Sequence, residues 1–431
     1  MNDAFAALPA AFAQVPTGTK RLAVAFSGGL DSTALLHALI DSAPTWPVRA
    51  IHVCHHLQPE AQSWALACAR QAEASGVAFT RLDVAVETRG RGLEAAARKA
   101  RYAALEAELA RGETLITAHH ARDQAETFVL QALRGAGPQG LAAMPRVAAL
   151  GAHCHWRPWL HIDHDTITAY ARAHQLDWID DPSNHDPNVA RSFLREAVMP
   201  ELRKRWPQAD RLLSRSAAHA GEAAAAIDAL ADIDLAQMWR NDATLDASAL
   251  ATLDWPRAKQ VVRRWLDQDG HDRPDHRHVA AIVALGASRL AASPCVAFAD
   301  TEVRLFDGRL YAMARLAPVP ERFACVWHGR APATLPAGCG EIALAPAPPR
   351  DLDLEVRLRR GGERVSDAQG GHRGVKDILR EARLAPWLRA RVPLVYHADT
   401  LIAIGDIWRH PHVAQLLHCD IGRFIWRDRP A

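Results

Sequence analysis

The feature that most constrains the fold is a glycine-rich turn, Ser27–Ser32, which joins a short apolar run to a helical pattern. Residues 21–26 are apolar without alternation, as is typical of a strand that is buried on both faces of a parallel sheet. Apolar residues then recur at helical spacing through residues 31–40. Two glycines let the backbone turn tightly, and the exposed amides at the start of the next helix can bind an anion. The turn therefore predicts a phosphate-binding loop between a strand and a helix.

The same alternation of strand and helix continues beyond this turn. We expect strands at residues 48–53, 77–84 and 114–117, and helices at residues 62–75, 93–110 and about 120–133. Apolar runs separated by helices of this length form βαβ units. The pattern therefore predicts an α/β fold with a doubly wound parallel sheet.

The rest of the chain predicts two smaller α+β domains. We expect the catalytic domain to cover residues 1–215, a middle domain that binds substrate to cover residues 216–330, and a basic C-terminal domain to cover residues 351–431. The stretch 331–350 contains five prolines and many alanines, so it predicts a linker between the last two domains.

Composition excludes several classes of protein. The sequence has no run of about 18 uncharged apolar residues and no basic start followed by an apolar run, so we expect a cytoplasmic protein. No two of the seven cysteines lie within ten residues of each other, which excludes a local CxxC site. The net charge is only +2, so a nucleic-acid surface has to be local. Residues 191–215 hold seven cations against three acids, and residues 357–391 hold ten against four; either run alone is also compatible with a solvated helix face.

Asp31 lies inside the glycine-rich turn, where a carboxylate would repel a phosphate unless a cation lay between them. We therefore interpret Asp31 as a Mg²⁺ ligand. A plain tight turn is the alternative, but the six-residue string at a strand–helix junction favours a nucleotide site. The Walker pattern Gly-x-x-x-x-Gly-Lys-Ser/Thr is absent. The predicted nucleotide-binding residues are Ser27, Gly28, Gly29, Leu30, Asp31 and Ser32.

A second polar constellation follows the strand that ends at Thr117. His119, Asp123 and Glu126 are spaced i, i+4 and i+7, so we expect them on one helix face. Such a face can bind Mg²⁺ or an ammonium group, and His119 could shuttle a proton or stabilise a phosphate. A ligand site is favoured over a solvated face because doubly wound sheets bind ligands where their strands end. The trio His52, His55 and His56 lacks further metal ligands at familiar spacing, so we expect no zinc there.

Arg98 and Arg101 share a helix face with Glu94, where they could bind phosphates or form an internal ion pair.

The glycine-rich turn resembles the PP-loop of the N-type ATP pyrophosphatases. Within that superfamily, further segments look like those of the tRNA(Ile)-lysidine synthetase family and span most of residues 21–206: Ile51–Leu57, Gly92–Tyr102, Arg134–Leu141, Trp178–Asn184 and Arg191–Arg195. The strings Gly371–Leu379 and Ala385–Arg389 resemble the family's C-terminal tRNA-binding domain. Trp387 in the second string either stacks on a base or, as we favour, packs in the core.

The resemblance implies a ligase that uses ATP and Mg²⁺ to attach L-lysine to the wobble cytosine of a tRNA(Ile) with a CAU anticodon. The 2-carbonyl oxygen would be adenylated with release of pyrophosphate, and lysine would then displace AMP. The resemblance leaves open whether the protein forms a homodimer. The implied catalytic residues are Asp31, His119, Asp123 and Glu126, with Asp31 on the metal. The implied phosphate- or substrate-binding residues are Arg98, Arg101, Arg191 and Arg195, and the implied tRNA-binding residues are Arg373, Lys376, Arg380 and Arg389.

Two alternatives stay open, and only the second belongs to another functional class. A PP-loop tRNA thiolase would share the ATP chemistry, but such enzymes commonly need a nucleophilic cysteine or a cysteine cluster, and this chain has no close cysteine pair. A non-catalytic tRNA-binding protein would not need an intact Ser27–Ser32 loop. ATP turnover in the presence of tRNA separates it from an enzyme.

Overall fold

A computed structural model describes residues 5–56, 58–86, 93–180, 190–240, 243–286, 294–366 and 371–429. The chain forms two compact units, Met1–Ala226 and Ile227–Ala431. Within the described residues, no helix is both long enough and apolar enough to cross a membrane.

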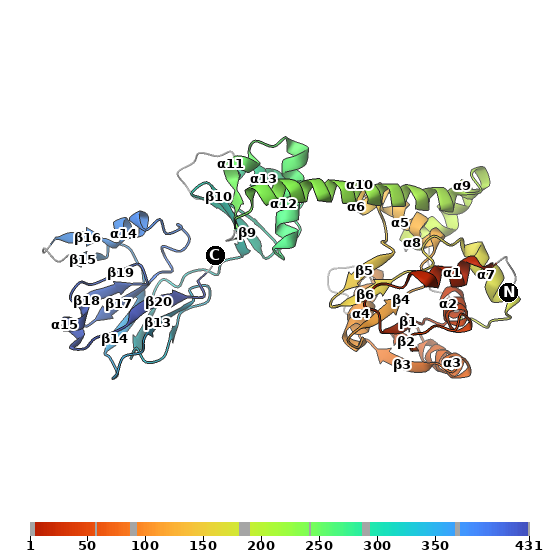
Figure 1. The fold of residues 1–431 in the computed structure, drawn as a ribbon, viewed down its shortest axis with the longest axis horizontal. Helices are drawn as coiled ribbons and strands as arrows, with labels where there is room; N and C mark the ends of the chain where they lie inside the picture. The colour runs from red at the N-terminus through yellow and green to blue at the C-terminus, as the bar shows by residue number, and fades with distance from the viewer. Residues whose placement is uncertain are drawn as a thin grey trace. The chain divides into compact units, whose positions relative to one another are not determined.

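The first unit is built on a six-stranded sheet with the order β3-β2-β1-β4-β6-β5 (Figure 1). Neighbouring strands are parallel except for β5, which runs antiparallel to β6. This arrangement confirms the predicted, mostly parallel α/β sheet. The strands are β1 (Arg21–Ala25), β2 (Val48–Cys54), β3 (Ala78–Asp83), β4 (Glu113–Ile116), β5 (Val147–Leu150) and β6 (His153–Trp156).

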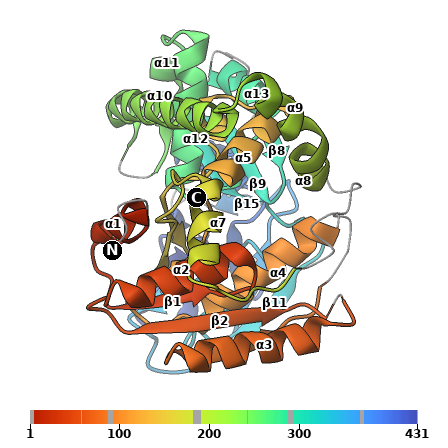
Figure 2. The same ribbon diagram turned by 90° about the vertical axis from the view of Figure 1, so that its right-hand side faces the viewer.

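Helices cover both faces of this sheet. Figure 2 shows α7 (His164–Ala173), α2 (Leu30–Asp41) and α3 (Ala61–Ala74) one below the other on one face. Leu22 and Val24 of β1 pack into the core beneath them, whereas Ala23 packs with Leu105 of α4 (Leu93–Glu108) in a separate cluster. The central strand is therefore buried on both sides, which explains its unbroken apolar sequence. The other helices of this unit are α1 (Ala7–Ala10), a 3₁₀-helix (Ala11–Gln14), α5 (Ala121–Leu133), α6 (Pro138–Leu141), α8 (Ala190–Phe193), a π-helical segment (Leu194–Val198) and α9 (Met199–Arg205).

The order of strands fixes where a ligand can bind. From β1 the chain builds outward through β2 to β3 and then returns to place β4 on the other side of β1. The loops that follow β1 and β4 therefore leave in opposite directions and open a crevice at the carboxyl ends of these strands. The glycine-rich turn follows β1, and His119 and His120 follow β4. The topology thus brings both polar constellations to one place.

The helix α10 (Ala209–Met238) begins in the first unit and contributes its end to the second, where a small antiparallel sheet has the order β7-β10-β9-β8. Trp265 and Val279, on two helices of this domain, are buried in its core. The elements are β7 (Leu245–Asp246), α11 (Ala247–Leu250), α12 (Trp255–Gln268), α13 (His276–Gly286), β8 (Cys295–Phe298), β9 (Thr301–Phe306) and β10 (Arg309–Ala314).

The C-terminal part of the second unit contains three sheets, with the orders β11-β14-β17-β18-β19, β12-β13-β20 and β15-β16. Trp387 is buried in its core and makes edge contacts with Phe306 and Tyr311 of the preceding domain, as the sequence favours. The elements are β11 (Ala324–Trp327), β12 (Ala333–Thr334), β13 (Glu341–Ala345), β14 (Leu354–Leu358), β15 (Arg364–Ser366), β16 (His372–Gly374), α14 (Val375–Glu381), β17 (Pro393–His397), β18 (Thr400–Ile404), β19 (Trp408–Arg409), α15 (Val413–Leu417) and β20 (Arg423–Arg427).

The proline-rich stretch 331–350 is not a free linker. It contains β12 and β13, and β13 pairs along its whole length with β20. Ile342 and Leu344 of β13 are buried in the C-terminal core. The prolines that suggested a linker flank these strands, where proline is tolerated. A count of prolines therefore does not reveal the two short strands that lie between them.

Candidate active site

The glycine-rich turn is held by its own hydroxyl groups. The amide of Gly29 donates to Ser27 Oγ over 3.3 Å, and the hydroxyl of Ser32 donates to the carbonyl of Gly29 over 3.1 Å. The two serine oxygens lie 3.0 Å apart. Because α2 begins at Leu30, the positive end of a twelve-residue helix faces this turn. The loop is therefore built to hold an anion.

Gly28 is the residue that lets the turn close. Its φ is +79°, and a Cβ atom at this position would lie 2.6 Å from Cys68 Sγ and 2.6 Å from Ile179 Cδ1. The amide of Ile179 also donates to the carbonyl of Gly28 over 2.9 Å. A segment far along the chain thus packs directly against the loop and leaves no space for a side chain.

We expect Gly28→Ala to destabilise the protein by about 2–3 kcal/mol, since it adds a steric clash to the cost of about 1–2 kcal/mol for a left-handed backbone. Gly76→Ala is the matched control: Gly76 also has a positive φ, +67°, but nothing lies within 4 Å of its Cβ position. Urea denaturation of both variants measures the difference. Equal losses of stability would show that the contacts with Cys68 and Ile179 are unimportant.

Asp31, in the first turn of α2, lies between two imidazole rings. Its carboxylate oxygens are 3.5 Å from His120 Nε2 and 3.2 Å from His164 Nε2. Burial raises the pKa of Asp31, but the hydrogen bonds and charges of the two histidines outweigh burial and hold this pKa below its usual range. The carboxylate is therefore ionised. Asp31, His120 and His164 place one ligand atom each within 4.8 Å of the others and could hold a cation.

His120 caps α5, and this corrects one expectation from the spacing. The amide of Asp123 donates to His120 Nδ1 over 3.4 Å, and the amide of His120 donates to Asp123 Oδ2 over 3.1 Å. This reciprocal capping box starts α5 at Ala121. His119 therefore precedes the helix and does not share a helical face with Asp123 and Glu126. Burial lowers the pKa of His120, but the charges of Asp123 and Asp31 outweigh burial and raise it overall.

Asp123 and Glu126 form a compact charged group with two arginines from the α8 segment and the π-helical segment that follows it. Arg191 donates to Glu126 Oε2 and to Asp123 Oδ1, each over 2.9 Å. Arg195 donates to both oxygens of Glu126 over 2.8 and 2.9 Å. Glu126 is fully buried. Burial raises the pKa of Asp123, but the nearby charges of His120 and Arg191 lower it to about 2. Two carboxylates and two guanidinium groups thus meet beside Asp31.

The remaining predicted residues of the first unit lie near this group. The guanidinium groups of Arg98 and Arg101 are 5.1 and 5.6 Å from the centre of the Tyr102 ring on α4. The charge of Arg98 also contributes to the low pKa of His119, which burial lowers to about 3. The side chain of Glu94 and residues 181–184 of the Trp178–Asn184 segment lie outside the described residues.

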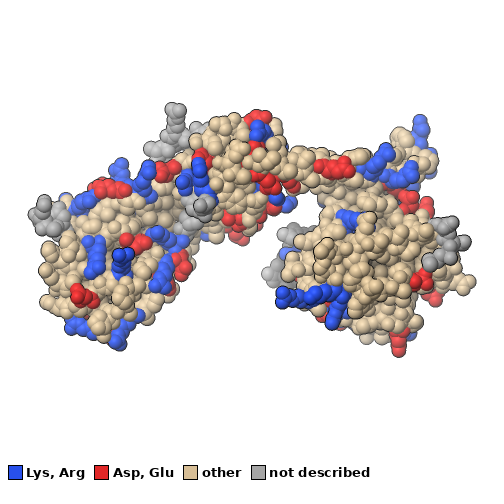
Figure 3. All heavy atoms as spheres, viewed as in Figure 1, with Lys and Arg blue, Asp and Glu red and all other residues tan. Residues whose placement is uncertain are grey.

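The predicted tRNA-binding cations gather around α14. Lys376 and Arg380 on this helix are exposed, and Arg373 of β16 forms an ion pair with Glu381. Arg389 donates from Nε to the carbonyl of Leu384 over 2.8 Å. Burial and the nearby charges of Arg380 and Arg359 lower the pKa of Arg389. Figure 3 shows Lys and Arg side chains spread over the surface of this domain.

The structure also gathers a group that spacing along the chain does not reveal. Cys54 Sγ lies 3.8 Å from His56 Nδ1, and His56 Nε2 lies 2.6 Å from Asp83. Arg81 donates to the same carboxylate over 2.6 Å. A guanidinium thus neutralises Asp83 where a metal would otherwise bind. The signal that could have revealed this group is that Cys54 and Asp83 both end neighbouring parallel strands.

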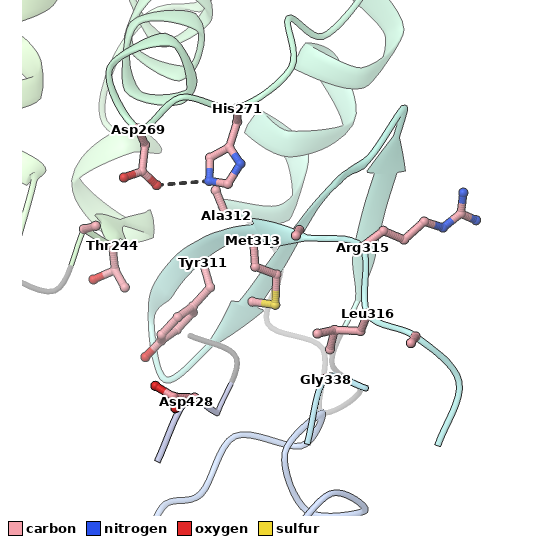
Figure 4. Close-up of a pocket in the computed structure, with 13 residues that line it drawn as sticks. Thr244, Asp269, His271, Tyr311, Ala312, Met313, Arg315, Leu316, Gly338 and Asp428 are labelled. Atoms are coloured by element: carbon pink, nitrogen blue, oxygen red, sulfur yellow. Dashed lines mark hydrogen bonds and ion pairs between the residues drawn. The ribbon is translucent and has the colours of Figure 1, made fainter. Parts of the chain in front are cut away.

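A cavity of about 550 Å³ lies in the second unit, along β10 and the chain that follows it (Figure 4). His271 and Asp269 face each other at its wall, with 3.0 Å between Nε2 and the carboxylate. Tyr311, Met313 and Asp428 are among the other lining residues. None of the predicted site residues lines it.

Comparisons with known proteins cover most of the chain. Residues 5–202 match the family model of the PP-loop domain, residues 245–311 match the TilS substrate binding domain, and residues 354–426 match the TilS substrate C-terminal domain. The tRNA(Ile)-lysidine synthase of Methylococcus capsulatus is 40% identical over 399 residues, which cover 89% of this chain and 90% of that protein. The tRNA(Ile)-lysidine synthase of Xanthomonas campestris is 39% identical over 94% of both chains, and that of Ralstonia nicotianae is 41% identical over 93% and 94%. The chain belongs to the tRNA(Ile)-lysidine synthase family.

Membership of the tRNA(Ile)-lysidine synthase family makes this chain an ATP-using ligase that modifies tRNA(Ile), and it disfavours the thiolase and the non-catalytic alternatives. A solved U34-tRNA thiolase from Methanococcus maripaludis is similar over 50% of this chain and 77% of its own, with 16% identity and a TM-score of 0.42, which is too low to carry an argument. All predicted site residues lie within the PP-loop or C-terminal matches. The sequence did not predict that His120 and His164 contact Asp31 or that Thr117 contacts His119.

Proposed function

We propose that the Ser27–Ser32 loop and Asp31 hold Mg²⁺–ATP while the 2-carbonyl oxygen of the wobble cytosine attacks the α-phosphorus and pyrophosphate leaves. A lysine amine then attacks carbon 2, loses a proton, and displaces the oxygen as part of AMP. Cytosine is a poor electrophile because its ring is electron-rich. Conversion of the carbonyl oxygen into a leaving group is what makes amine attack feasible.

The observation that carries this proposal is the group of Asp123, Glu126, Arg191 and Arg195 next to Asp31. An amino acid presents one ammonium and one carboxylate on its α-carbon, and lysine presents a second ammonium. Carboxylates and guanidinium groups already paired with each other can exchange these partners for the charges of lysine at little electrostatic cost. We therefore assign lysine to this group and not to the glycine-rich loop.

Asp31 fits the role of metal ligand. Its carboxylate is ionised, and its two oxygens face His120 Nε2 over 3.5 Å and His164 Nε2 over 3.2 Å, so that three possible ligand atoms face one point. An ionised carboxylate oxygen can take the place of a water on Mg²⁺. The metal would neutralise charge on the ATP phosphates, and Asp31 would fix its position.

The direct test is to incubate the protein with ATP, labelled lysine and tRNA(Ile) that carries a CAU anticodon. We expect label in the tRNA, with AMP and pyrophosphate formed in equal amounts, because the loop lacks the Walker lysine that reaches the β- and γ-phosphates. The same tRNA with a UAU anticodon is the control and should stay unlabelled. Stoichiometric ADP, or label in the control, would contradict the proposal.

We further propose that Arg373, Lys376, Arg380 and Arg389 bind the tRNA backbone. The exposure of Lys376 and Arg380 on α14 supports this role, since exposed cations can reach the phosphates of a nucleic acid. A cut near Arg350 would separate β13 from the following strands that its sheet needs, so substitution of side chains is the sharper test.

The double variant Lys376→Ala and Arg380→Ala should weaken tRNA binding by about tenfold at moderate salt. The slope of log K against log salt concentration should decrease by the amount expected for the loss of up to about two phosphate contacts. Fluorescence anisotropy at several salt concentrations measures both quantities. Arg423→Ala is the matched control, because Arg423 is exposed on β20 outside the basic run. An unchanged salt slope in the double variant would move the tRNA site to residues 191–215.

A further inference from the structure

A line of four side chains, of which the first three are buried, leads from the end of β6 to the candidate active site. Arg157 Nη2 lies 3.0 Å from His155 Nδ1, and His155 Nε2 lies 2.9 Å from the hydroxyl oxygen of Thr117. That oxygen lies 2.7 Å from His119 Nδ1. Arg157, His155 and Thr117 are each less than a tenth exposed. Water therefore has little access to these contacts, and each hydrogen-bond donor in the line has to find its acceptor within the line.

The chemistry of arginine fixes the direction of every bond in this line. A guanidinium can only donate, so His155 Nδ1 accepts and the proton of this ring lies on Nε2. His155 then donates from Nε2 to the Thr117 oxygen. The single proton of the Thr117 hydroxyl is left for His119 Nδ1, which accepts it. The proton of His119 consequently lies on Nε2.

The opposite arrangement is unfavourable. If His119 donated from Nδ1, the Thr117 oxygen would accept from both rings and its own proton would face no acceptor in the line. A buried donor without a partner costs about 1–3 kcal/mol. If His155 were protonated on Nδ1, two N–H groups would point at each other across 3.0 Å.

We propose that Arg157, His155 and Thr117 are positioning residues that hold His119 as a neutral imidazole with its proton on Nε2. His119 then acts as a hydrogen-bond donor to substrate oxygens and not as a base. Each ring accepts a hydrogen bond on Nδ1, so neither ring can carry a proton on both nitrogens, and both are neutral in this arrangement. The role of His119 as a donor rests on the adenylation proposed above, because phosphoryl oxygens gain negative charge in that step. The position of the proton does not depend on it.

The state of His119 can be read by nitrogen NMR of the full chain labelled with ¹⁵N-histidine. The His119→Gln variant identifies the His119 signals by their loss. We expect the wild-type ring to show a protonated Nε2 and an unprotonated Nδ1 at pH 7. Thr117→Val, which keeps shape but removes the hydroxyl, should produce a mixture of both tautomers, and Thr117→Ser should restore one. A wild-type ring with its proton on Nδ1, or a charged ring, would overturn the proposal without any variant.

Kinetics separates positioning from a purely structural role. Thr117→Val should lower kcat by about tenfold and leave KM for ATP within about twofold, since the donor is misplaced while the nucleotide loop is untouched. Thr117→Ser should recover most of kcat. His153→Asn is the matched control, because His153 lies on β6 like His155 but is not part of the hydrogen-bonded line. It should change neither the tautomer of His119 nor kcat. An unchanged tautomer in Thr117→Val would overturn the inference. If the wild-type chain formed no lysidine but showed the expected tautomer, the proposed chemistry would fail and the hydrogen-bonded line would stand.

Discussion

Replacement of Asp31 by asparagine is expected to reduce lysidine formation by at least about a hundredfold, which corresponds to a loss of ~3 kcal/mol of transition-state stabilisation. The amide keeps the size of the side chain but removes the charge that we assign to Mg²⁺. The measurement is the initial rate of lysine incorporation at saturating ATP. The loss should be partly relieved by Mn²⁺, which binds nitrogen- and oxygen-containing sites more tightly than Mg²⁺.

Asp41→Asn is the matched control for this variant. Asp41 ends the same helix, α2, and is exposed, so its substitution should leave the rate near that of the wild-type chain. Thermal unfolding of both variants should be similar to that of the wild-type chain. A near-normal rate in Asp31→Asn would show that Asp31 is not a metal ligand.

Glu126→Gln is expected to abolish most activity and also to destabilise the fold. Glu126 is fully buried and accepts hydrogen bonds from Arg191 and Arg195, so the amide leaves two guanidinium groups short of negative charge. Loss of one partner of a buried ion pair costs about 3 kcal/mol or more. We expect the rate to fall by about a hundredfold or more with KM for lysine raised, because these charges are the ones that we assign to lysine.

Glu113→Gln distinguishes loss of stability from loss of function. Glu113 is also buried and accepts two hydrogen bonds from Arg49, over 2.8 and 2.7 Å. It lies at the amino-terminal end of β4, whereas the candidate site lies beyond the carboxyl end of this strand. Its substitution should lower the unfolding temperature to a similar extent while kcat of the folded protein stays within about threefold. If both variants lost activity equally, global destabilisation and not lysine binding would explain the effect of Glu126→Gln.

The first unit could largely be predicted from its sequence because its strands are buried on both faces. The predicted strand 21–26 agrees with β1 (Arg21–Ala25), and the predicted helix 93–110 agrees with α4 (Leu93–Glu108). The strand β6 was missed, since its sequence His-Cys-His-Trp has no apolar run. One reason is visible in the structure: His155 uses its position on β6 for hydrogen bonds with Arg157 and Thr117 and not for packing.

The candidate site was predictable where one loop supplies its residues and unpredictable where distant segments meet. The loop Ser27–Ser32 followed from glycine spacing alone. The meeting of Glu126 with Arg195 has no local signal, and the family resemblance implied a role for each residue but not their contact. The helical face of His119, Asp123 and Glu126 was wrong in part, because spacing cannot show that His120 caps α5 and leaves His119 outside the helix.

The pairing of β13 with β20 also affects how the C-terminal domain can fold. Leu344 and Phe424 are register partners although 80 residues separate them in the sequence (424 minus 344). Such distant pairs have to wait for the chain between them to be synthesised and ordered, and they slow folding through the entropy of loop closure. Until β20 is synthesised, the edge of β13 that pairs with it has no partner. A nonsense mutation a few codons before Arg423 would leave β13 without this partner permanently.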